Sequence, residues 1–221
     1  MHDAYFRIIS DVHGLQGNYL RRASKAKYSL QLGDLSVNKY DFLRRLNPDY
    51  HKVISGNHEN FEKDSEWYFR KQPHFLGNYG VWGVPKFGDV FYLRGGFSRN
   101  LVEKIRNKTW SNEEQLDQVE FRKAFNLYEW MEPKLMVTHE APRRMLEHIL
   151  HPDDIDEESD TDTNVALDKM MDKHQPDVWV FGHYHKYVSK YLDGTHFIGL
   201  DKTPKNGSFI DFPENWEPKL S

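Results

Sequence analysis

The sequence predicts a single α/β domain, and two observations predict it. Apolar segments ending in short polar tips alternate with helical segments, which is typical of βαβ units on a parallel sheet. The 221 residues suffice for one sizeable core, and no Gly/Ser-rich or Pro-rich stretch could serve as a linker. We therefore expect one domain over residues 1–221, with a helical insertion at about residues 98–133.

The first part of the chain supplies three strands that each end at polar residues. These strands are predicted at Ala4–Ser10, Ser29–Leu32 and His51–Ile54. A loop and helix over Gly14–Lys25 connect the first two. The next helical segment, Tyr40–Leu46, stops at Asn47-Pro48, because the residue before proline avoids the helical region.

The middle of the chain predicts a hairpin, a long helix and a strand. Val81–Val84 and Val90–Leu93 are short strands separated by Pro85 and Gly88. Ser111 and Glu114 fit a capping box that opens a helix. The apolar residues of this helix recur at helical spacing and predict a core face: Phe121, Ala124, Phe125 and Tyr128. Pro133 ends the helix, and Lys134–Thr138 is the next strand.

Residues 153–162 hold seven acids in ten positions. An EF-hand would need Gly at its sixth position and Glu at its twelfth, where this chain has Glu158 and Asn164. We therefore expect a solvated, mobile loop. A helix at about Asn164–Lys173, a strand at Asp177–Phe181 and a hairpin around Asp193-Gly194 complete the prediction.

Composition excludes several classes of function. The formal charge of −4, with basic pairs scattered among acids, argues against long nucleic acid as a partner. Without cysteine, the chain has no disulfide, thiolate metal site or cysteine nucleophile. The N-terminal segment does not resemble a signal peptide, and no apolar run is long enough for a membrane span, so we expect a cytoplasmic protein with no membrane partner.

Metal-competent side chains follow five of the predicted strands. They are Asp11, His13, Asp34, Asn57, His139, His183 and His185, with His58 directly after Asn57. Each short motif is weak alone, but in open α/β sheets ligands bind at the carboxyl ends of strands, so we expect all of these groups at one edge.

The ligand types indicate two divalent ions. Two such ions about 3.5 Å apart need a bridging oxygen donor, and Asp34 is the natural bridge because imidazole cannot bridge. Mixed Asp, His and Asn ligands without sulfur favour Mn, Fe, Zn or Ni over Ca or Mg. We expect Mn as the first candidate.

Five blocks resemble the calcineurin-like metallophosphoesterase family, in the family's order. They are Asp11-Val-His13, Gly33-Asp34, Gly56-Asn57-His58-Glu59, Thr138-His139 and Gly182-His183-Tyr-His185. The resemblance runs from about residue 5 to 200. It implies a four-layer α/β/β/α sandwich of two packed sheets flanked by helices.

The resemblance also implies roles for individual residues. One metal would take Asp11, His13, Asp34 and His185, and the second would take Asp34, Asn57, His139 and His183. A metal-bridging hydroxide would attack phosphorus in line. His58 would contact the phosphate and protonate the leaving oxygen as general acid.

One departure from the family pattern argues against the protein Ser/Thr phosphatase branch. The protein Ser/Thr phosphatase branch continues Gly-Asp as Gly-Asp-x-x-Asp-Arg-Gly, whereas this chain has Gly33-Asp34-Leu-Ser-Val-Asn38. The segments from Arg94 to Arg99 and from Trp110 to Glu114 resemble small phosphoesterases of phages and bacteria instead. Arg94 and Arg99 are candidates for clamping a phosphate, with structural pairing to nearby acids as the alternative.

The leading functional hypothesis is a phosphomonoesterase acting on a phosphorylated small molecule or a phosphoprotein. The alternative within enzymes is a phosphodiesterase acting on cyclic nucleotides or nucleic-acid ends. A non-catalytic metal-binding scaffold of the same fold is the third hypothesis, and His58 argues against it, because a scaffold has no need of a non-ligand histidine after Asn57.

Overall fold

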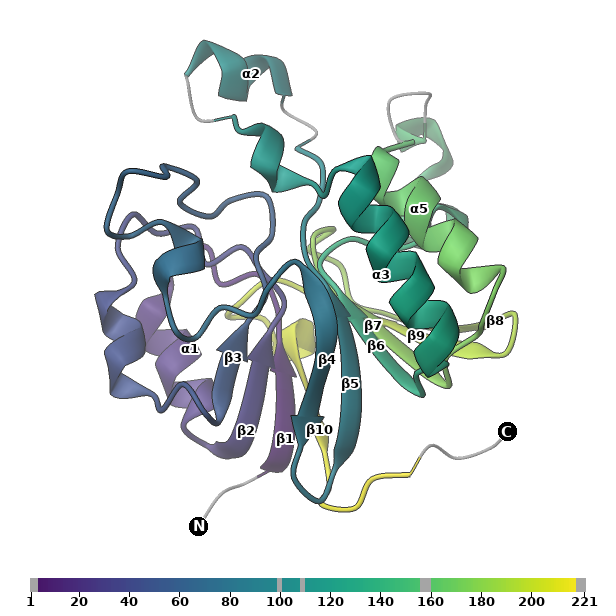
Figure 1. Ribbon diagram of the computed structural model, residues 1–221, viewed down its shortest axis with the longest axis horizontal. Helices are drawn as coiled ribbons and strands as arrows, with labels where there is room; N and C mark the ends of the chain where they lie inside the picture. Colours follow the sequence, from purple (N-terminus) through teal and green to yellow (C-terminus); the bar gives the residue numbers. More distant parts are fainter. Residues whose placement is uncertain (1–3, 99–100, 108–109, 156–159, 218–221) are drawn as a thin grey trace.

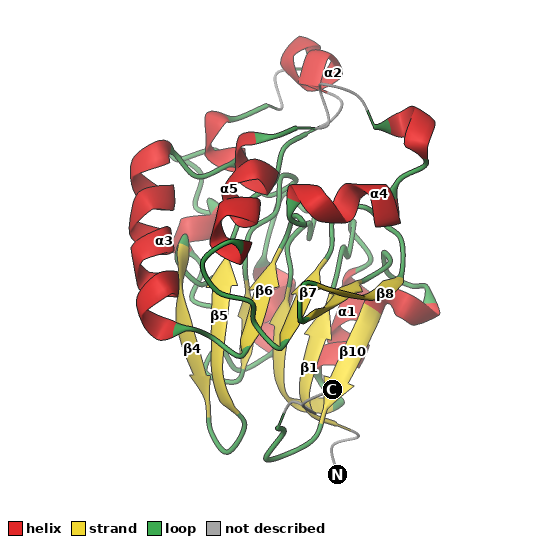
Figure 2. Cartoon of the chain, turned by 90° about the vertical axis from the view of Figure 1, so that its right-hand side faces the viewer, coloured by secondary structure: helices red, strands yellow, loops and turns green. Residues whose placement is uncertain are grey.

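The chain forms two β-sheets that pack face to face, with helices on their outer sides (Figures 1 and 2). The computed structural model describes residues 4–98, 101–107, 110–155 and 160–217. Within them, the four layers are helix, sheet, sheet and helix, which confirms the predicted fold class. No helix of these residues is long and apolar enough to cross a membrane.

The smaller sheet has four strands in the order β10-β1-β2-β3. Their bounds are β1 Ala4–Ile9, β2 Ala26–Gln31, β3 His51–Val53 and β10 Phe209–Phe212. The first three run parallel, and β10 pairs antiparallel with β1. The strand β10 was not predicted from the sequence.

The larger sheet has six strands in the order β4-β5-β6-β7-β9-β8. Their bounds are β4 Tyr79–Val84, β5 Gly88–Leu93, β6 Leu135–Thr138, β7 Val178–Phe181, β8 Val188–Leu192 and β9 Thr195–Gly199. Strands β5, β6, β7 and β9 are parallel. The two predicted hairpins are confirmed and place β4 and β8 antiparallel at the edges.

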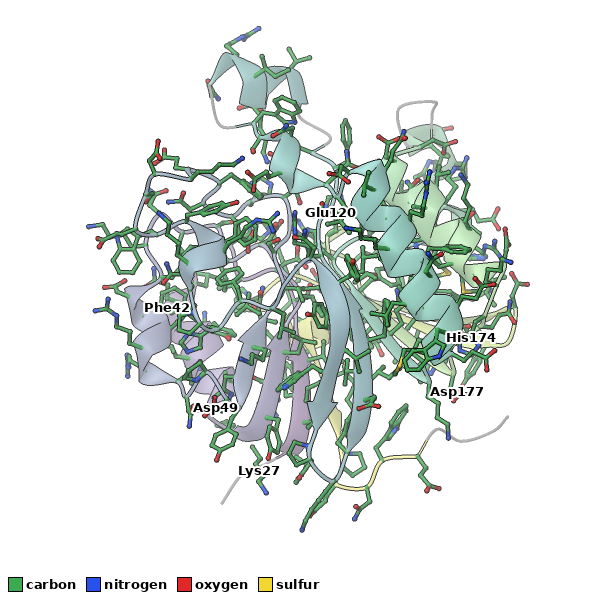
Figure 3. All side chains as sticks on the ribbon, in the orientation of Figure 1. Lys27, Phe42, Asp49, Glu120, His174 and Asp177 are labelled. Carbon is green, nitrogen blue, oxygen red and sulfur yellow. The ribbon has the colours of Figure 1, made fainter. Side chains whose placement is uncertain are left out.

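Helices cover both outer faces. On the smaller sheet lie α1 (Gln16–Ala23) and the 3₁₀ helix η1 (Asp41–Arg45), with Phe42 on this outer side (Figure 3). On the larger sheet lie α3 (Gln118–Met131), α4 (Leu146–Ile149) and α5 (Asp162–Met171). The short α2 (Leu101–Arg106) stands away from the sheets in Figure 1. Further 3₁₀ helices are η2 Phe69–Lys71, η3 Asn112–Glu114, η4 Arg143–Met145, η5 Pro152–Asp154 and η7 Asn206–Ser208.

Three apolar clusters hold the layers together. The central cluster lies between the sheets and includes Phe6 and Val137, while Tyr19 belongs to the cluster under α1 and Trp179 to the cluster under α3 and α5. These side chains are fully buried. Burying a side chain of this size contributes about 1.5–3 kcal/mol, so the sandwich is a stable platform for its loops.

The region around α3 differs from the prediction in one respect. The capping box of Ser111 and Glu114 is present, but it opens only the single turn of η3. A second capping box, of Asp117 and Glu120, opens α3. The chain is extended at Gln115 between the two, and the adjacent Leu116 is buried. The predicted core face of α3 is confirmed by Ala124 and Tyr128, which are fully buried.

Of the predicted acidic loop, residues 156–159 lie outside the described residues. On either side of them, η5 ends at Asp154 and α5 begins at Asp162.

Candidate metal centre

The seven predicted ligands lie at the carboxyl ends of strands from both sheets. Asp11 and His13 follow β1, Asp34 follows β2, Asn57 follows β3, His139 follows β6, and His183 and His185 follow β7. Six of them, all except Asn57, form two groups, and within each group the potential ligand atoms lie within 4.8 Å of one another. The first group is Asp11, His13, Asp34 and His185, and the second is Asp34, His139 and His183.

The first group brings two imidazoles against two buried carboxylates. His13 Nε2 and His185 Nε2 are 2.7 Å apart. Asp11 Oδ1 lies 3.4 Å from His185 Nε2 and 3.8 Å from His13 Nε2. Asp34 Oδ2 lies 3.7 Å from His13 Nε2. Four donor atoms therefore face one small volume.

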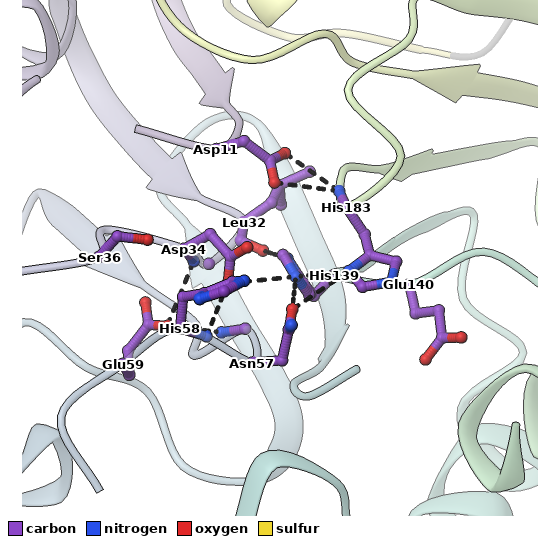
Figure 4. A network of polar contacts seen from close by, with 12 residues as sticks. Asp11, Leu32, Asp34, Ser36, Asn57, His58, Glu59, His139, Glu140 and His183 are labelled. Atoms are coloured by element: carbon purple, nitrogen blue, oxygen red, sulfur yellow. Dashed lines mark hydrogen bonds and ion pairs between the residues drawn. The ribbon is translucent and has the colours of Figure 1, made fainter. Parts of the chain in front are cut away.

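The second group has the spacing of a tetrahedral metal site once Asn57 is added. Asn57 Oδ1 lies 3.0 Å from His139 Nε2 and 3.2 Å from His183 Nδ1. The two imidazole nitrogens are 3.2 Å apart, and Asp34 Oδ1 lies 3.4 Å from His139 Nε2. Donors about 2.0–2.1 Å from one ion at tetrahedral angles are about 3.3 Å from one another, so this set fits a metal. Figure 4 shows these side chains pointing toward one another.

The hydrogen bond of His139 also fits a cation. His139 Nδ1 donates to the carbonyl oxygen of Leu32 at 2.7 Å, because a carbonyl can only accept. In its neutral form, which is the form that binds a metal, the ring presents its Nε2 lone pair to Asn57 Oδ1, which is also an acceptor. Two acceptors at this distance repel unless a cation lies between them, and a backbone contact of this kind is typical of metal-ligating histidines.

The ligand backbones are unusual. Ten non-glycine residues of the described chain have a positive φ, and half of them are predicted ligands: Asp11, His13, Asp34, His183 and His185. Non-glycine residues adopt this region rarely and at a cost of about 1–3 kcal/mol each. Such strain is retained where it aims side chains at a functional site.

Two glycines leave room for the ligands. A Cβ atom on Gly56 would collide with Asp34 Oδ1 and would lie 2.6 Å from His139 Nε2. A Cβ atom on Gly182 would collide with Asp11 Oδ2 and Ser10 Oγ. Larger residues at either position would displace ligand side chains.

Glu59 fixes two of the ligand loops, which the sequence did not predict. This buried carboxylate accepts hydrogen bonds from the backbone N–H groups of Leu35 at 3.1 Å and of Asp34 and Gly56 at 3.3 Å. Burial raises the pKa of Glu59 well above its usual range, and the adjacent Asp34 charge adds to this rise. In the sequence, the available signal was its position directly after His58. Its role could not be predicted from that position, because it depends on tertiary contacts with the loop of Asp34.

The protonation states of Asp34 and His13 suit metal binding. Burial alone would raise the pKa of Asp34. The electrostatic effect of four neighbouring imidazoles outweighs burial and holds this pKa at about 2, so Asp34 is ionised; they belong to His139, His58, His13 and His183. Burial lowers the pKa of His13, which the neighbouring Asp34 and Asp11 only partly offset. A neutral imidazole is the form that binds metal.

His58 lies beside both groups without belonging to either. Its backbone N–H donates to Asp34 Oδ1 at 3.0 Å, and its ring centroid is 5.7 Å from that of His13. Its half-buried side chain lines a pocket of about 310 Å³, which Asn38, Asn60 and Asn107 also line. Burial lowers the pKa of His58, and Asp34 partly offsets this.

Of the two candidate arginines, Arg94 does not join these groups. Arg94 is buried, donates to Asn78 Oδ1 and to the carbonyl oxygen of Glu113 at 2.6 Å each, and lies over the ring of Phe69. These contacts favour the structural alternative for Arg94 over the phosphate clamp. Arg99 lies outside the described residues.

Comparison with known proteins identifies the family. The calcineurin-like phosphoesterase model, Metallophos, matches residues 5–187. The chain is a calcineurin-like phosphoesterase. The family makes it a phosphoric ester hydrolase, and its members typically bind two divalent metals, for which this phosphoesterase has the two candidate groups described above. No curated protein matches the chain.

Two solved structures share the phosphoesterase fold. The phosphopantetheinyl hydrolase PptH of Mycobacterium tuberculosis is 14% identical over 94% of this chain and 95% of its own, with a TM-score of 0.54. A Staphylococcus aureus protein assigned as a 5′-nucleotidase, in complex with α-ketoglutarate, is 14% identical over 89% of this chain and 48% of its own, also with a TM-score of 0.54. At these identities the likeness concerns the fold alone.

Proposed function

We propose that this phosphoesterase is a dinuclear metal-dependent phosphomonoesterase, and the orientation of Asp34 carries the proposal. Its Oδ2 faces the first group, 3.7 Å from His13 Nε2, and its Oδ1 faces the second, 3.4 Å from His139 Nε2. One carboxylate thus offers an oxygen to each group, as a bridge between two ions requires.

The residues would hold the ions as follows. Asp11, His13, Asp34 and His185 would bind one ion, and Asp34, Asn57, His139 and His183 the other. Oxygen and imidazole donors without sulfur favour Mn, with Fe, Zn or Ni as alternatives. When bound, such a pair supplies Lewis-acid neutralisation of phosphate oxygens and a water-derived nucleophile at neutral pH.

His58 is the proposed general acid. Its backbone N–H holds it beside the carboxylate of Asp34, so its ring does not serve as a metal ligand. Burial lowers its pKa, but an incoming phosphate dianion would raise that pKa and favour the protonated ring. The ring could then donate a proton to the leaving oxygen.

The pocket beside His58 supports a small leaving group. Its volume of about 310 Å³ is at the lower end of the range of about 300–1,000 Å³ for ligand pockets. Its mostly polar lining, which includes amide side chains and the charged Glu103 and Lys104, suits a polar alcohol such as a sugar or the side chain of a phosphoprotein. The substrate would therefore be a phosphorylated small molecule or phosphoprotein rather than long nucleic acid.

The test is hydrolysis of a nitrophenyl phosphomonoester and of the matching diester, after stripping metal and adding back Mn²⁺. We expect clear preference for the monoester. Sugar phosphates and nucleoside 5′-monophosphates would then be compared as natural leaving groups, the latter because one structural neighbour is assigned as a 5′-nucleotidase. A diester preference would replace the proposal by the phosphodiesterase alternative, and no turnover with Mn, Ni, Zn or Fe would overturn both.

A further inference from the structure

A buried polar relay connects the segment between β5 and α3 to the predicted ligand Asn57. Its members are Ser98, Lys104 of α2 and Glu114 of η3, whose exposed fractions are 1%, 6% and 2%. None of the three follows a strand carrying a predicted ligand, and none belongs to the five blocks of the family pattern.

The relay runs from the amide of Asn57 to a carboxylate. Asn57 Nδ2 lies 2.9 Å from Ser98 Oγ, which lies 2.5 Å from Glu114 Oε2. Lys104 Nζ donates to Glu114 Oε1 at 2.9 Å and to the backbone carbonyl oxygen of Asn57 at 2.6 Å. The segment therefore holds both the side chain and the main chain of Asn57.

The chemistry of these groups sets the direction of every hydrogen bond. Glu114 accepts from Lys104 and from the backbone N–H of Ser111 at 3.4 Å through Oε1, and from the Ser98 hydroxyl through Oε2, so both of its oxygens act as acceptors. Ser98 must then donate its single hydroxyl hydrogen to Glu114, so it can only accept a hydrogen bond from Asn57. Asn57 must present its NH₂ group to Ser98 and its Oδ1 to the imidazoles.

This direction matters because an amide has two ends of nearly equal shape. Only Oδ1 can bind a metal, whereas the NH₂ end would point hydrogens at the site. A buried ion pair such as Lys104–Glu114 is by itself weak evidence for stability, because desolvation offsets its Coulomb attraction. A requirement to orient Asn57 would explain why polar groups occupy this buried place.

We propose that Ser98 and Glu114 are positioning residues that select the metal-binding orientation of Asn57, with Lys104 anchoring the Asn57 backbone. This inference rests on the proposed two-ion site, and it extends that site to α2 and η3. Partners of this kind typically contribute about 10–100-fold to metal affinity.

The test is titration of metal-stripped protein with Mn²⁺ by isothermal calorimetry. We expect Ser98→Ala to lower the affinity for one of the two ions about 10–100-fold and to leave the affinity for the other unchanged. The same loss should remain when His185→Ala has removed a ligand of the other ion. Ser98→Thr, which keeps the hydroxyl, should restore most of the affinity.

The control is Ser111→Ala, which removes a hydroxyl from the same segment that caps η3 through the N–H of Glu113 and does not contact Asn57. It should lower thermal stability without changing either affinity. If the loss in Ser98→Ala is matched by Ser111→Ala, or if Ser98→Ala binds both ions as wild type does, the relay is refuted. Glu114→Gln is the second variant, and it should also weaken the same ion.

Ester hydrolysis is measured on the same samples to separate the two proposals. The proposed function would be refuted and the relay supported if wild-type protein binds two ions but cleaves no ester, and if Ser98→Ala lowers the affinity for one of the ions. Wild-type protein that cleaves esters while Ser98→Ala keeps both affinities would refute the relay alone. Wild-type protein that binds fewer than two ions would refute both.

Discussion

At the scale of single residues, the site is shaped by atoms that aim ligands as much as by the ligands themselves. Asp34 directs one oxygen to each group, His139 is turned by its hydrogen bond to Leu32, and Glu59 holds the loops of Asp34 and Gly56. Ligands held in this way lose little conformational freedom on binding an ion.

The first residue-scale prediction concerns His58. Its replacement in His58→Ala should lower kcat by about 10²–10⁴-fold, the usual contribution of a general acid. Metal content should remain at two ions per chain, because His58 is in neither ligand group. The measurement is steady-state hydrolysis of the nitrophenyl monoester with metal analysis of the same protein.

The control for His58 is His196→Ala. His196 lies near the start of β9, at the sheet edge opposite the ligands, and contacts Ser189. Its replacement should leave kcat unchanged. An unchanged kcat in His58→Ala as well would remove His58 from the mechanism.

The second residue-scale prediction concerns Gly56. In Gly56→Ala the added methyl group meets Asp34 Oδ1 and His139, so we expect weaker Mn²⁺ binding and a loss of about 1–3 kcal/mol in unfolding free energy from overpacking. Calorimetric titration and thermal unfolding measure the two effects. Gly17→Ala is the matched control, because no heavy atom lies within 4 Å of its added Cβ. Similar affinities in both variants would contradict the close packing at Gly56.

At the scale of elements, the strand ends deliver the ligands and the outer helices hold the sheets in place. The helix α3 illustrates how local sequence signals act. Asp117 accepts from the N–H of Glu120 at 2.8 Å, and the side chain of Glu120 accepts from the N–H of Asp117 at 3.3 Å. This reciprocal cap begins the helix that buries Tyr128 against the larger sheet.

The element-scale prediction is that Asp117→Ala lowers the unfolding free energy by about 1 kcal/mol, the usual value of an N-cap. For a chain of this length that corresponds to a melting temperature about 2–4 °C lower. Metal affinity should not change, because Asp117 is not among the ligands. The control Asp49→Ala removes an exposed carboxylate from a loop and should change stability by less than about 0.5 kcal/mol. Equal melting temperatures in the two variants would show that the cap contributes nothing.

At the scale of the whole molecule, the site lies across the junction of the two sheets. The smaller sheet supplies Asp11, His13, Asp34 and Asn57, and the larger sheet supplies His139, His183 and His185. Each proposed ion takes ligands from both sheets. Metal binding should therefore stabilise the packing of the sheets as well as prepare the site.

The whole-molecule prediction is that Mn²⁺ raises the melting temperature. At a concentration of about 100 times the dissociation constant, one ion stabilises the folded state by about 2.7 kcal/mol. For a chain of this length that is roughly 5–10 °C, and chelation should reverse it. His58→Ala should keep the full shift and His183→Ala should lose part of it. A shift of equal size in both variants would contradict the assignment of His183.

The sequence by itself determined which residues are available and near which strand ends they lie. Ligand types, their order and the apolar strands before them are local patterns, so the family and the edge of the site could be predicted from them. The core face of α3 was predictable for the same reason, since helical spacing is local.

Only the tertiary structure decided which groups face one another. The division of ligands into two groups, the burial of Arg94 and the pairing of β10 with β1 depend on contacts between distant segments. The sequence predicted a helix cap for Glu114, and the structure adds its contact with Ser98. The relay joins Asn57 to Ser98 across 41 positions of the chain. No periodicity or short motif encodes such a contact, because it exists only once the sheets and the segment between β5 and α3 have packed together.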